Sequence, residues 1–216
     1  MREAYVITIL NNERSVQVAE RCIKSGKKHG LEIEKWKATI PKDNPEKIMK
    51  EYGINPQAFD EVYSRTDNCM AAFLSHYSLW KKAVEDKIDV LIFEHDAVIV
   101  DTIPEVNGYQ GCITFGKPSY GKFNIPRYLG VQELQHKKYF GGAHAYQVSW
   151  QAAEVLIKKA KSQAAPTDVY LHLDNFRFLQ EYYPWPVEAR DSFTTIQVEK
   201  GCLAKHKYNK ETYDII

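Results

Sequence analysis

The stretch from Cys69 to Val100 constrains the fold more than any other part of the chain. Apolar side chains in its first half recur at three- and four-residue spacing, which predicts one face of a helix. They are Phe73, Tyr77, Trp80 and Val84. Asp67 or Asn68 is expected to cap the start of this helix. Residues 90–93 then form a continuous apolar run, which is typical of a strand buried on both faces. A helix followed by such a strand indicates an α/β fold.

Three polar residues, Glu94, His95 and Asp96, end this apolar run abruptly. The carboxyl end of a buried strand is where open α/β sheets bind their ligands. Two carboxylates separated by one residue can address one hard divalent cation. The alternative is a strand that simply ends in a charged turn.

The N-terminal part of the chain predicts a strand, a helix and a second strand at residues 5–10, 13–29 and 31–39. This order favours a parallel strand pair joined by a right-handed crossover. A short helix is expected at residues 45–52, because Pro45 suits a first helical position. Further strands are expected within residues 111–116 and 139–149, and a helix at residues 150–161.

Size and composition favour an ordinary globular protein of one domain. The chain has 216 residues, 44% hydrophobic and 26% charged, with a net charge of +1, so no global field points to nucleic acid or to an anionic membrane. The four cysteines are far apart and lack C-x-x-C spacing, which argues against a zinc site and favours reduced, buried thiols. No apolar run approaches the length of a membrane span, so a cytoplasmic protein is expected.

Several segments resemble glycosyltransferase family 25, which contains lipopolysaccharide-type and collagen-type galactosyltransferases. The first is SHYSLWKKAVEDKIDVLIFEHDA, which is similar to the family's Ser-His helix and apolar strand ending in Glu-Asp-Asp-Ala. Here His95 replaces the middle acidic residue. Others are GGAHAY from residue 141, PTDVY from residue 166 and YYPWPVEAR from residue 182. The resemblance extends from about residue 5 to residue 192.

This resemblance implies an α/β fold of GT-A type, with a Rossmann-like, mixed, mostly parallel sheet flanked by helices. We expect a single domain over residues 1–216, with a nucleotide-sugar half at about 1–100 and an acceptor-side half at about 101–216. The implied activity is metal-dependent, inverting transfer of galactose or another hexose from a nucleotide diphosphate, expected to be UDP, with Mn²⁺ or Mg²⁺. A saccharide is the expected acceptor; protein hydroxylysine and a hydroxylated DNA base are the alternatives. The competing interpretation is a catalytically degenerate module that binds a glycan or a protein. Its only support in the sequence is His95.

The resemblance also assigns roles to individual residues. Glu94 and Asp96 would hold the metal. No motif of the family supports His206, which is proposed as a third ligand only because a distal histidine completes the metal shell in several GT-A enzymes. His95 is expected to point away from the metal, since neighbours on a strand alternate. Asp168 is the favoured catalytic base and Asp174 the second candidate. The residues expected at the donor are Thr8, Arg14, Ser75, His76, Gly142 and His144.

Structural roles compete with several of these assignments. Arg14 could be a solvated residue in the first turn of a helix, and His76 and His144 could be satisfied core histidines. Asp168 could cap a helix. The loop predicted at residues 117–138 combines tyrosines with basic residues, which would suit a hydroxyl-rich or phosphorylated acceptor or could be a solvated surface.

Overall fold

A seven-stranded sheet forms the centre of the protein in the computed structural model, which describes residues 2–59, 65–106, 109, 111–190, 193–197 and 214–215. Its strand order is β2-β1-β3-β7-β5-β8-β6. The strands are β1 (Arg2–Thr8), β2 (Glu34–Lys37), β3 (Asp89–Glu94), β5 (Cys112–Thr114), β6 (Gly130–Glu133), β7 (Ala145–Val148) and β8 (Leu179–Tyr183). Strands β2, β1, β3, β5 and β8 share one direction, while β7 and β6 run opposite to it. The predicted mixed, mostly parallel sheet is confirmed.

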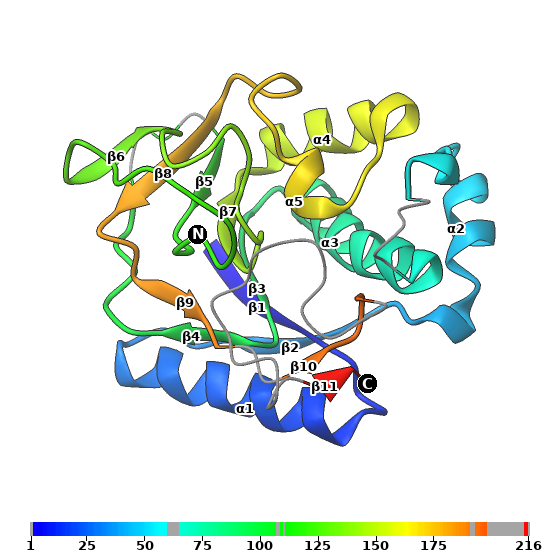
Figure 1. Cartoon of the computed structure of the whole chain (residues 1–216), viewed down its shortest axis with the longest axis horizontal. Helices are drawn as coiled ribbons and strands as arrows, with labels where there is room; N and C mark the ends of the chain where they lie inside the picture. Colours follow the sequence, from blue (N-terminus) through cyan, green and yellow to red (C-terminus); the bar gives the residue numbers. More distant parts are fainter. Residues whose placement is uncertain are drawn as a thin grey trace.

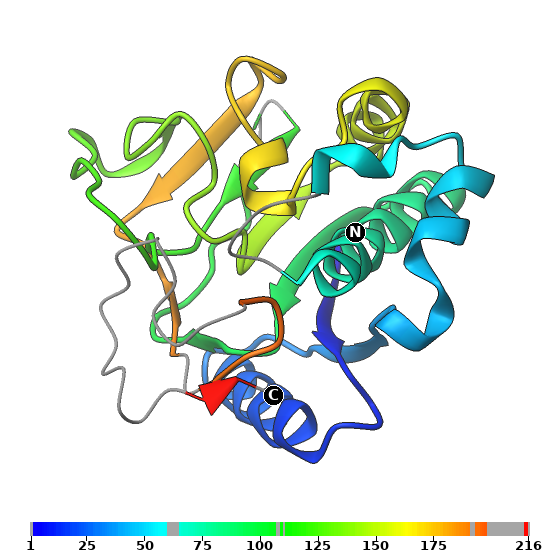
Figure 2. The same cartoon turned by 45° about the vertical axis from the view of Figure 1, so that its right-hand side comes forward.

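Helices cover both faces of this sheet (Figures 1 and 2). Helix α1 (Glu13–Lys28) packs on one face, and α3 (Thr66–Asp86) and α4 (Trp150–Gln163) pack on the other. The short helices are α2 (Pro45–Glu51), α5 (Thr167–Tyr170) and the 3-10 turns η1 (Pro41–Asp43) and η2 (Pro56–Phe59). Two small strand pairs complete the described part: β4 (Ala97–Ile99) with β9 (Val187–Ala189), and β10 (Phe193–Thr194) with β11 (Asp214–Ile215).

Strand β3 is buried on both faces, as its apolar run predicts. Val90 and Ile92 belong to the core beneath α3 and α4, whereas Leu91 and Phe93 belong to the core beneath α1. This alternation follows from the two-residue period of a strand. All four side chains have no exposed surface, so β3 fixes its register in both layers at once.

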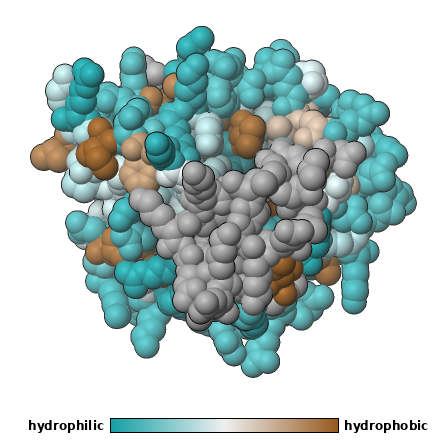
Figure 3. All heavy atoms as spheres, in the orientation of Figure 1, coloured by the Kyte–Doolittle hydropathy of each residue, from teal (hydrophilic) through white to brown (hydrophobic). Residues whose placement is uncertain are grey.

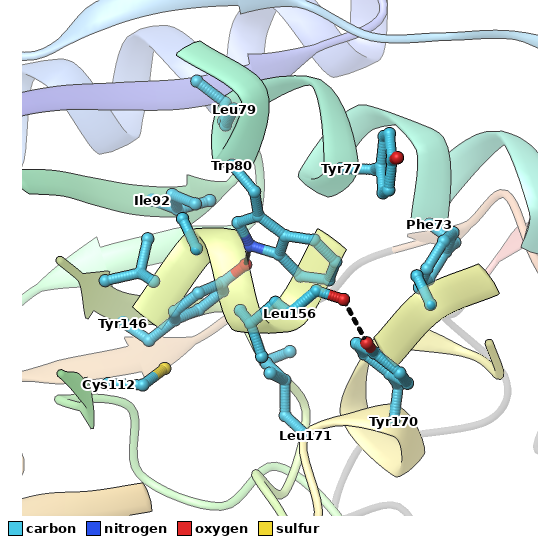
Figure 4. Packing of buried hydrophobic residues seen from close by; sticks show 14 of the residues in the cluster. Phe73, Tyr77, Leu79, Trp80, Ile92, Cys112, Tyr146, Leu156, Tyr170 and Leu171 are labelled. Atoms are coloured by element: carbon cyan, nitrogen blue, oxygen red, sulfur yellow. Dashed lines mark hydrogen bonds between the residues drawn. The ribbon is translucent and has the colours of Figure 1, made fainter. Parts of the chain in front are cut away.

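The core between the sheet and helices α3 and α4 is rich in aromatic rings (Figure 4). Trp80 packs edge-on to Phe73 and stacks with Tyr170, at centroid distances of 5.6 and 5.7 Å. The indole nitrogen of Trp80 donates a hydrogen bond to the Tyr146 hydroxyl, with 2.9 Å between the two atoms. The predicted apolar face of α3 is therefore correct, and Tyr146 of β7 joins the helix to the sheet.

Some predicted boundaries and connections need correction. Helix α3 begins at Thr66, and its N-cap is Arg65 without a side-chain hydrogen bond, so capping by Asp67 or Asn68 is wrong. Strand β6 lies within the segment predicted as a loop at residues 117–138. It pairs with β8 at the edge of the sheet. Its first residue, Gly130, has a φ of +85°.

Cys22 and Cys112 are buried free thiols, as predicted, Cys69 is also buried, and Cys202 lies outside the described residues. On the face shown in Figure 3, the described side chains are mostly hydrophilic, and apolar residues occur in small separate groups. None of the helices in the described part of the chain combines the length and apolarity needed to cross a membrane.

Candidate active site

A cavity of about 300 Å³ lies at the carboxyl ends of β1 and β3. Its walls come from the first half of α3, the turn after β3, the segment before β7, and α5, with residues 193–197 closing one side. Seven residues proposed from the sequence line it: Ser75, His76, Glu94, Asp96, Gly142, His144 and Asp168. The fold thus brings together residues from four distant parts of the chain.

The acidic triplet forms the end of β3 and the turn into β4. Glu94 is the last residue of β3, and Asp96 follows in the turn. The Nδ1 atom of His95 lies 2.8 Å from the Ser15 hydroxyl oxygen on α1, and its ring packs 5.3 Å from that of Phe193. His95 lines the cavity together with Glu94 and Asp96, and its Nδ1 atom is directed to α1.

A buried chain of hydrogen bonds orients Glu94. The Trp80 indole can only donate, so the Tyr146 oxygen accepts a hydrogen bond from it. The Tyr146 hydroxyl in turn donates a hydrogen bond to His76 Nδ1, with 3.0 Å between the two atoms. The proton of the His76 ring then lies on Nε2, which donates to Glu94 Oε1 at 3.2 Å. Burial lowers the pKa of His76 to about 3, so the ring is neutral. His76 is the satisfied core histidine of the alternative interpretation, and it also positions Glu94.

The cavity brings several acidic side chains together in a buried setting. Burial raises the pKa of Glu94 to about 8; Asp96 raises it further, His144 opposes this, and Asp168 adds the smallest increase. Burial also raises the pKa of Asp168 above its ordinary value. Among the described residues that line the cavity there is no lysine or arginine. An anionic ligand would therefore meet three acidic groups without a compensating side-chain cation.

Asp168 is held by Tyr120 from the other side of the cavity. The Tyr120 hydroxyl donates to Asp168 Oδ2, and the Val169 amide donates to Oδ1 at 2.9 Å. Helix α5 has Pro166 as its N-cap, without a side-chain hydrogen bond, so the helix-cap interpretation of Asp168 is wrong. Sequence reasoning placed Tyr120 only in a generally basic and aromatic loop, because no local pattern reports a partner 48 positions away.

The segment before β7 approaches the cavity through Gly142. Its φ is +103°, and a Cβ atom at this position would lie 2.4 Å from the Ser119 hydroxyl oxygen. Both observations require glycine here. The buried His144 donates from Nδ1 to the Gly142 carbonyl at 3.0 Å. Its Nε2 atom faces Gly116 and has no hydrogen-bond partner among the described residues.

Ser75 connects the helix to the rim of the cavity. Its hydroxyl donates to the Ala71 carbonyl at 2.8 Å and accepts from the Thr39 amide at 2.9 Å. The hydrogen bond fixes Thr39, two residues after the end of β2, against α3. A ligand would meet Ser75 as part of an already hydrogen-bonded wall.

Three described residues proposed from the sequence, Thr8, Arg14 and Asp174, do not line this cavity. Thr8 is buried, and its hydroxyl donates to the Val6 carbonyl. Arg14 lies 3.1 Å from Asp214 and 4.8 Å from the centre of the Phe193 ring, behind the wall that Phe193 forms. Asp174, with 69% of its side chain exposed, lies beside His172. His206 lies outside the described residues.

Glu94 and Asp96 are suitable ligands for Mg²⁺ or Mn²⁺. Among the described residues, no group of three or more His, Cys, Asp or Glu side chains is arranged to hold a metal ion. Magnesium at phosphate-bearing substrates is commonly held by one or two carboxylates together with the phosphates, not by a complete protein cage. The raised pKa of Glu94 also fits such a site, because a cation would relieve the repulsion between the carboxylates.

Comparisons with known proteins give a family match for the N-terminal half of the chain. A family model described as "Glycosyltransferase family 25 (LPS biosynthesis protein)" matches residues 1–110. No curated protein sequence matches the chain. Among solved structures, one similar chain is a mutant of Drosophila beta-1,4-galactosyltransferase 7 in complex with manganese, UDP-Gal and xylobiose. It is 9% identical, with a TM-score of 0.47, and the match covers 98% of this chain and 73% of that chain.

Proposed function

The chain belongs to glycosyltransferase family 25, and we propose that it is a metal-dependent, inverting glycosyltransferase that moves a hexose from UDP to a hydroxyl group of a saccharide. The cavity at the carboxyl ends of β1 and β3 would be its active site. Glu94 and Asp96 would hold a Mn²⁺ or Mg²⁺ ion, and Asp168 would serve as the base.

The observation that carries this proposal is the acidic composition of the cavity wall. Three carboxyl groups, those of Glu94, Asp96 and Asp168, meet there, and no lysine or arginine is among the described lining residues. A nucleotide diphosphate is itself an anion and would be repelled by such a wall. Binding therefore requires a cation between the two, and the pair at the end of β3 offers the oxygen ligands that a hard divalent ion prefers.

The transfer is a single in-line displacement at the anomeric carbon of the donor. The acceptor oxygen forms a bond to this carbon on one face while the bond to the diphosphate oxygen breaks on the other, which inverts the configuration. UDP leaves with the bonding electron pair, and a bound divalent ion would supply charge neutralisation of the diphosphate. The hydroxyl proton of the acceptor passes to Asp168.

Asp168 suits the role of base for three reasons. It lines the same cavity as the acidic pair. Burial raises its pKa, and a carboxylate of higher pKa accepts a proton more readily. The Tyr120 hydroxyl fixes the direction of one of its oxygens. The second candidate, Asp174, does not line the cavity.

Donor hydrolysis tests the proposal without knowledge of the acceptor, because water can replace the acceptor hydroxyl. We expect UDP-hexoses to be hydrolysed in the presence of Mn²⁺ and not after chelation. The Asp168→Asn substitution should leave Mn²⁺-dependent UDP binding intact and reduce turnover by roughly 10²-fold or more, the usual scale of general base catalysis.

Asp174→Asn is the matched control and should hydrolyse the donor at the wild-type rate. Normal turnover in Asp168→Asn with loss in Asp174→Asn would move the base to Asp174. Loss of UDP binding in Asp168→Asn would mean that Asp168 binds the donor and is not the base.

A further inference from the structure

A second cavity, of about 910 Å³, lies beside the first and is named here the basic cavity. Its walls come from residues 121–125 and 136–139 together with His172. Three lysines contribute to it: Lys122, Lys137 and Lys138. No aspartate or glutamate is among the described residues that line it. The sign of its charge is therefore opposite to that of the active-site cavity.

The lysines of the basic cavity are not neutralised by carboxylates. Lys122 and Lys138 are exposed, and neither forms an ion pair with any described residue. The Lys137 amino group donates to the Tyr120 carbonyl at 2.6 Å and lies 4.4 Å from the centre of the Tyr120 ring. It also lies 5.2 Å from the centre of the Tyr139 ring. Three positive charges thus surround a space that could hold an anion.

Two acidic residues, Glu181 and Asp174, contact histidines of this wall. Glu181 is fully buried behind His136 and accepts hydrogen bonds from the His136 ring and amide, the Gln135 amide and the Trp185 indole. Asp174 lies 3.5 Å from His172 and is mostly exposed. Neither residue lines the basic cavity, so neither cancels the charge of the lysines within it.

A stack of rings separates the basic cavity from the active site. Tyr120 and Tyr139 stack at 6.4 Å between ring centres, and Tyr139 and His172 stack at 6.1 Å with an interplanar angle of 14°. Tyr139 and His172 line the basic cavity, whereas Tyr120 lines the active site and bonds to Asp168. A saccharide with one hydroxyl at Asp168 would therefore pass over these rings to place its next unit beside the lysines.

We propose that the basic cavity is an acceptor subsite for an anionic saccharide, one that carries a carboxylate or phosphate group on the sugar unit next to the attacked hydroxyl. This inference rests on the proposed function, because it takes Asp168 as the point where the acceptor reacts. The lysines contact the anionic group, and the flat ring faces contact the sugar. Lys137 additionally holds the Tyr120 segment in place.

Calorimetric binding of matched sugars tests the subsite. The pairs are digalacturonate against neutral galactobiose, and glucose 6-phosphate against glucose, which separates a carboxylate from a phosphate preference. The anionic member of at least one pair should bind about tenfold more tightly to the wild type, and added salt should weaken it, as expected for two exposed ionic contacts. Equal binding within both pairs, or no binding of any sugar, overturns the proposal.

The variant pair separates this subsite from general surface charge. The double substitution Lys122→Gln/Lys138→Gln should abolish the preference for the anionic sugar. The control Lys158→Gln/Lys161→Gln removes the same charge from the exposed surface of α4 and should retain the preference. Loss in both variants, or in neither, contradicts the inference.

UDP binding with Mn²⁺ is measured on the same samples as an independent readout of the active site. It should be unchanged in both double variants. A wild-type protein that prefers the anionic sugar but fails to bind UDP with Mn²⁺ would disprove the proposed function while leaving the anionic sugar site in place.

Discussion

The Tyr146 hydroxyl links the aromatic core to Glu94 through hydrogen bonds to Trp80 and His76. Removing this hydroxyl gives a quantitative test of the hydrogen-bond chain. Tyr146→Phe deletes one oxygen from a position without exposed surface. The Trp80 indole nitrogen loses its acceptor, and His76 Nδ1 loses its donor. Both partners are buried, so water cannot replace the missing hydroxyl without a rearrangement of the core.

The expected cost follows from these two losses. Leaving a buried donor or acceptor unsatisfied costs about 1–3 kcal/mol per group, so the loss of two partners in Tyr146→Phe should lower the free energy of unfolding by about 2–6 kcal/mol. For a protein of this size that corresponds to a decrease in Tm of roughly 4–24 °C. Urea denaturation followed by circular dichroism measures the first quantity, and calorimetry measures the second.

Two tyrosines in the same core provide graded controls (Figure 4). The Tyr170 hydroxyl has one partner, the Leu156 carbonyl, at 2.5 Å. Tyr170→Phe should therefore cost about 1 kcal/mol. The Tyr77 hydroxyl forms no hydrogen bond with the described residues, so Tyr77→Phe should be close to neutral. If Tyr146→Phe is no more destabilising than Tyr77→Phe, the hydrogen-bond chain from Trp80 to Glu94 is refuted.

Two further predictions concern the charge and the backbone of the active site. Because metal binding requires ionised Glu94, whose pKa is raised to about 8, Mn²⁺-dependent UDP affinity should rise about tenfold per pH unit from about pH 6.5 and level off above pH 8. Glu94→Gln should remove this dependence in calorimetric titrations, and an equally steep rise in that variant would contradict the assignment. Gly142→Ala should lower the free energy of unfolding by about 1–3 kcal/mol, because φ is +103° and the new Cβ atom would meet Ser119. Gly53→Ala, with φ at +70° but nothing within 4 Å of the added Cβ atom, should cost less in the same denaturation assay.

The sequence allowed prediction of those features that local patterns encode. The apolar face of α3 and the doubly buried run of β3 depend on periodicity, and both are confirmed. The start and end of α1 and α2 agree with prediction to within a residue, because Pro45 and the polar residues around the helices are local signals. The acidic pair at the end of β3 was found for the same reason.

Long-range contacts explain what could not be predicted. The Tyr120 hydroxyl reaches Asp168, and Tyr146 joins Trp80 to His76 across 66 and 70 positions of sequence. No spacing rule reports such pairs. Strand β6 was also missed, because it is short and its pairing with β8 depends on where a distant segment folds back.

Two residues proposed from their neighbourhood in the sequence do not line the cavity, and their roles stay predictions. Thr8 lies on the strand that leads to the active site, yet its hydroxyl bonds to the Val6 carbonyl. Asp174 is near Asp168 in sequence, but the turn after α5 carries it to His172. In both cases the backbone path, which the sequence alone does not specify, decides where the side chain points.

Calorimetric titration of UDP, with and without Mn²⁺, tests the central claim most directly. The wild type should bind UDP only when Mn²⁺ is present, and Asp96→Asn should weaken that binding at least about tenfold, since even changes beyond the direct ligands of a metal have effects of this size. Asp101→Asn, an exposed acidic residue of the same segment, should bind like the wild type. UDP binding that persists in chelator, or that is unchanged in Asp96→Asn, would contradict a metal held at the end of β3.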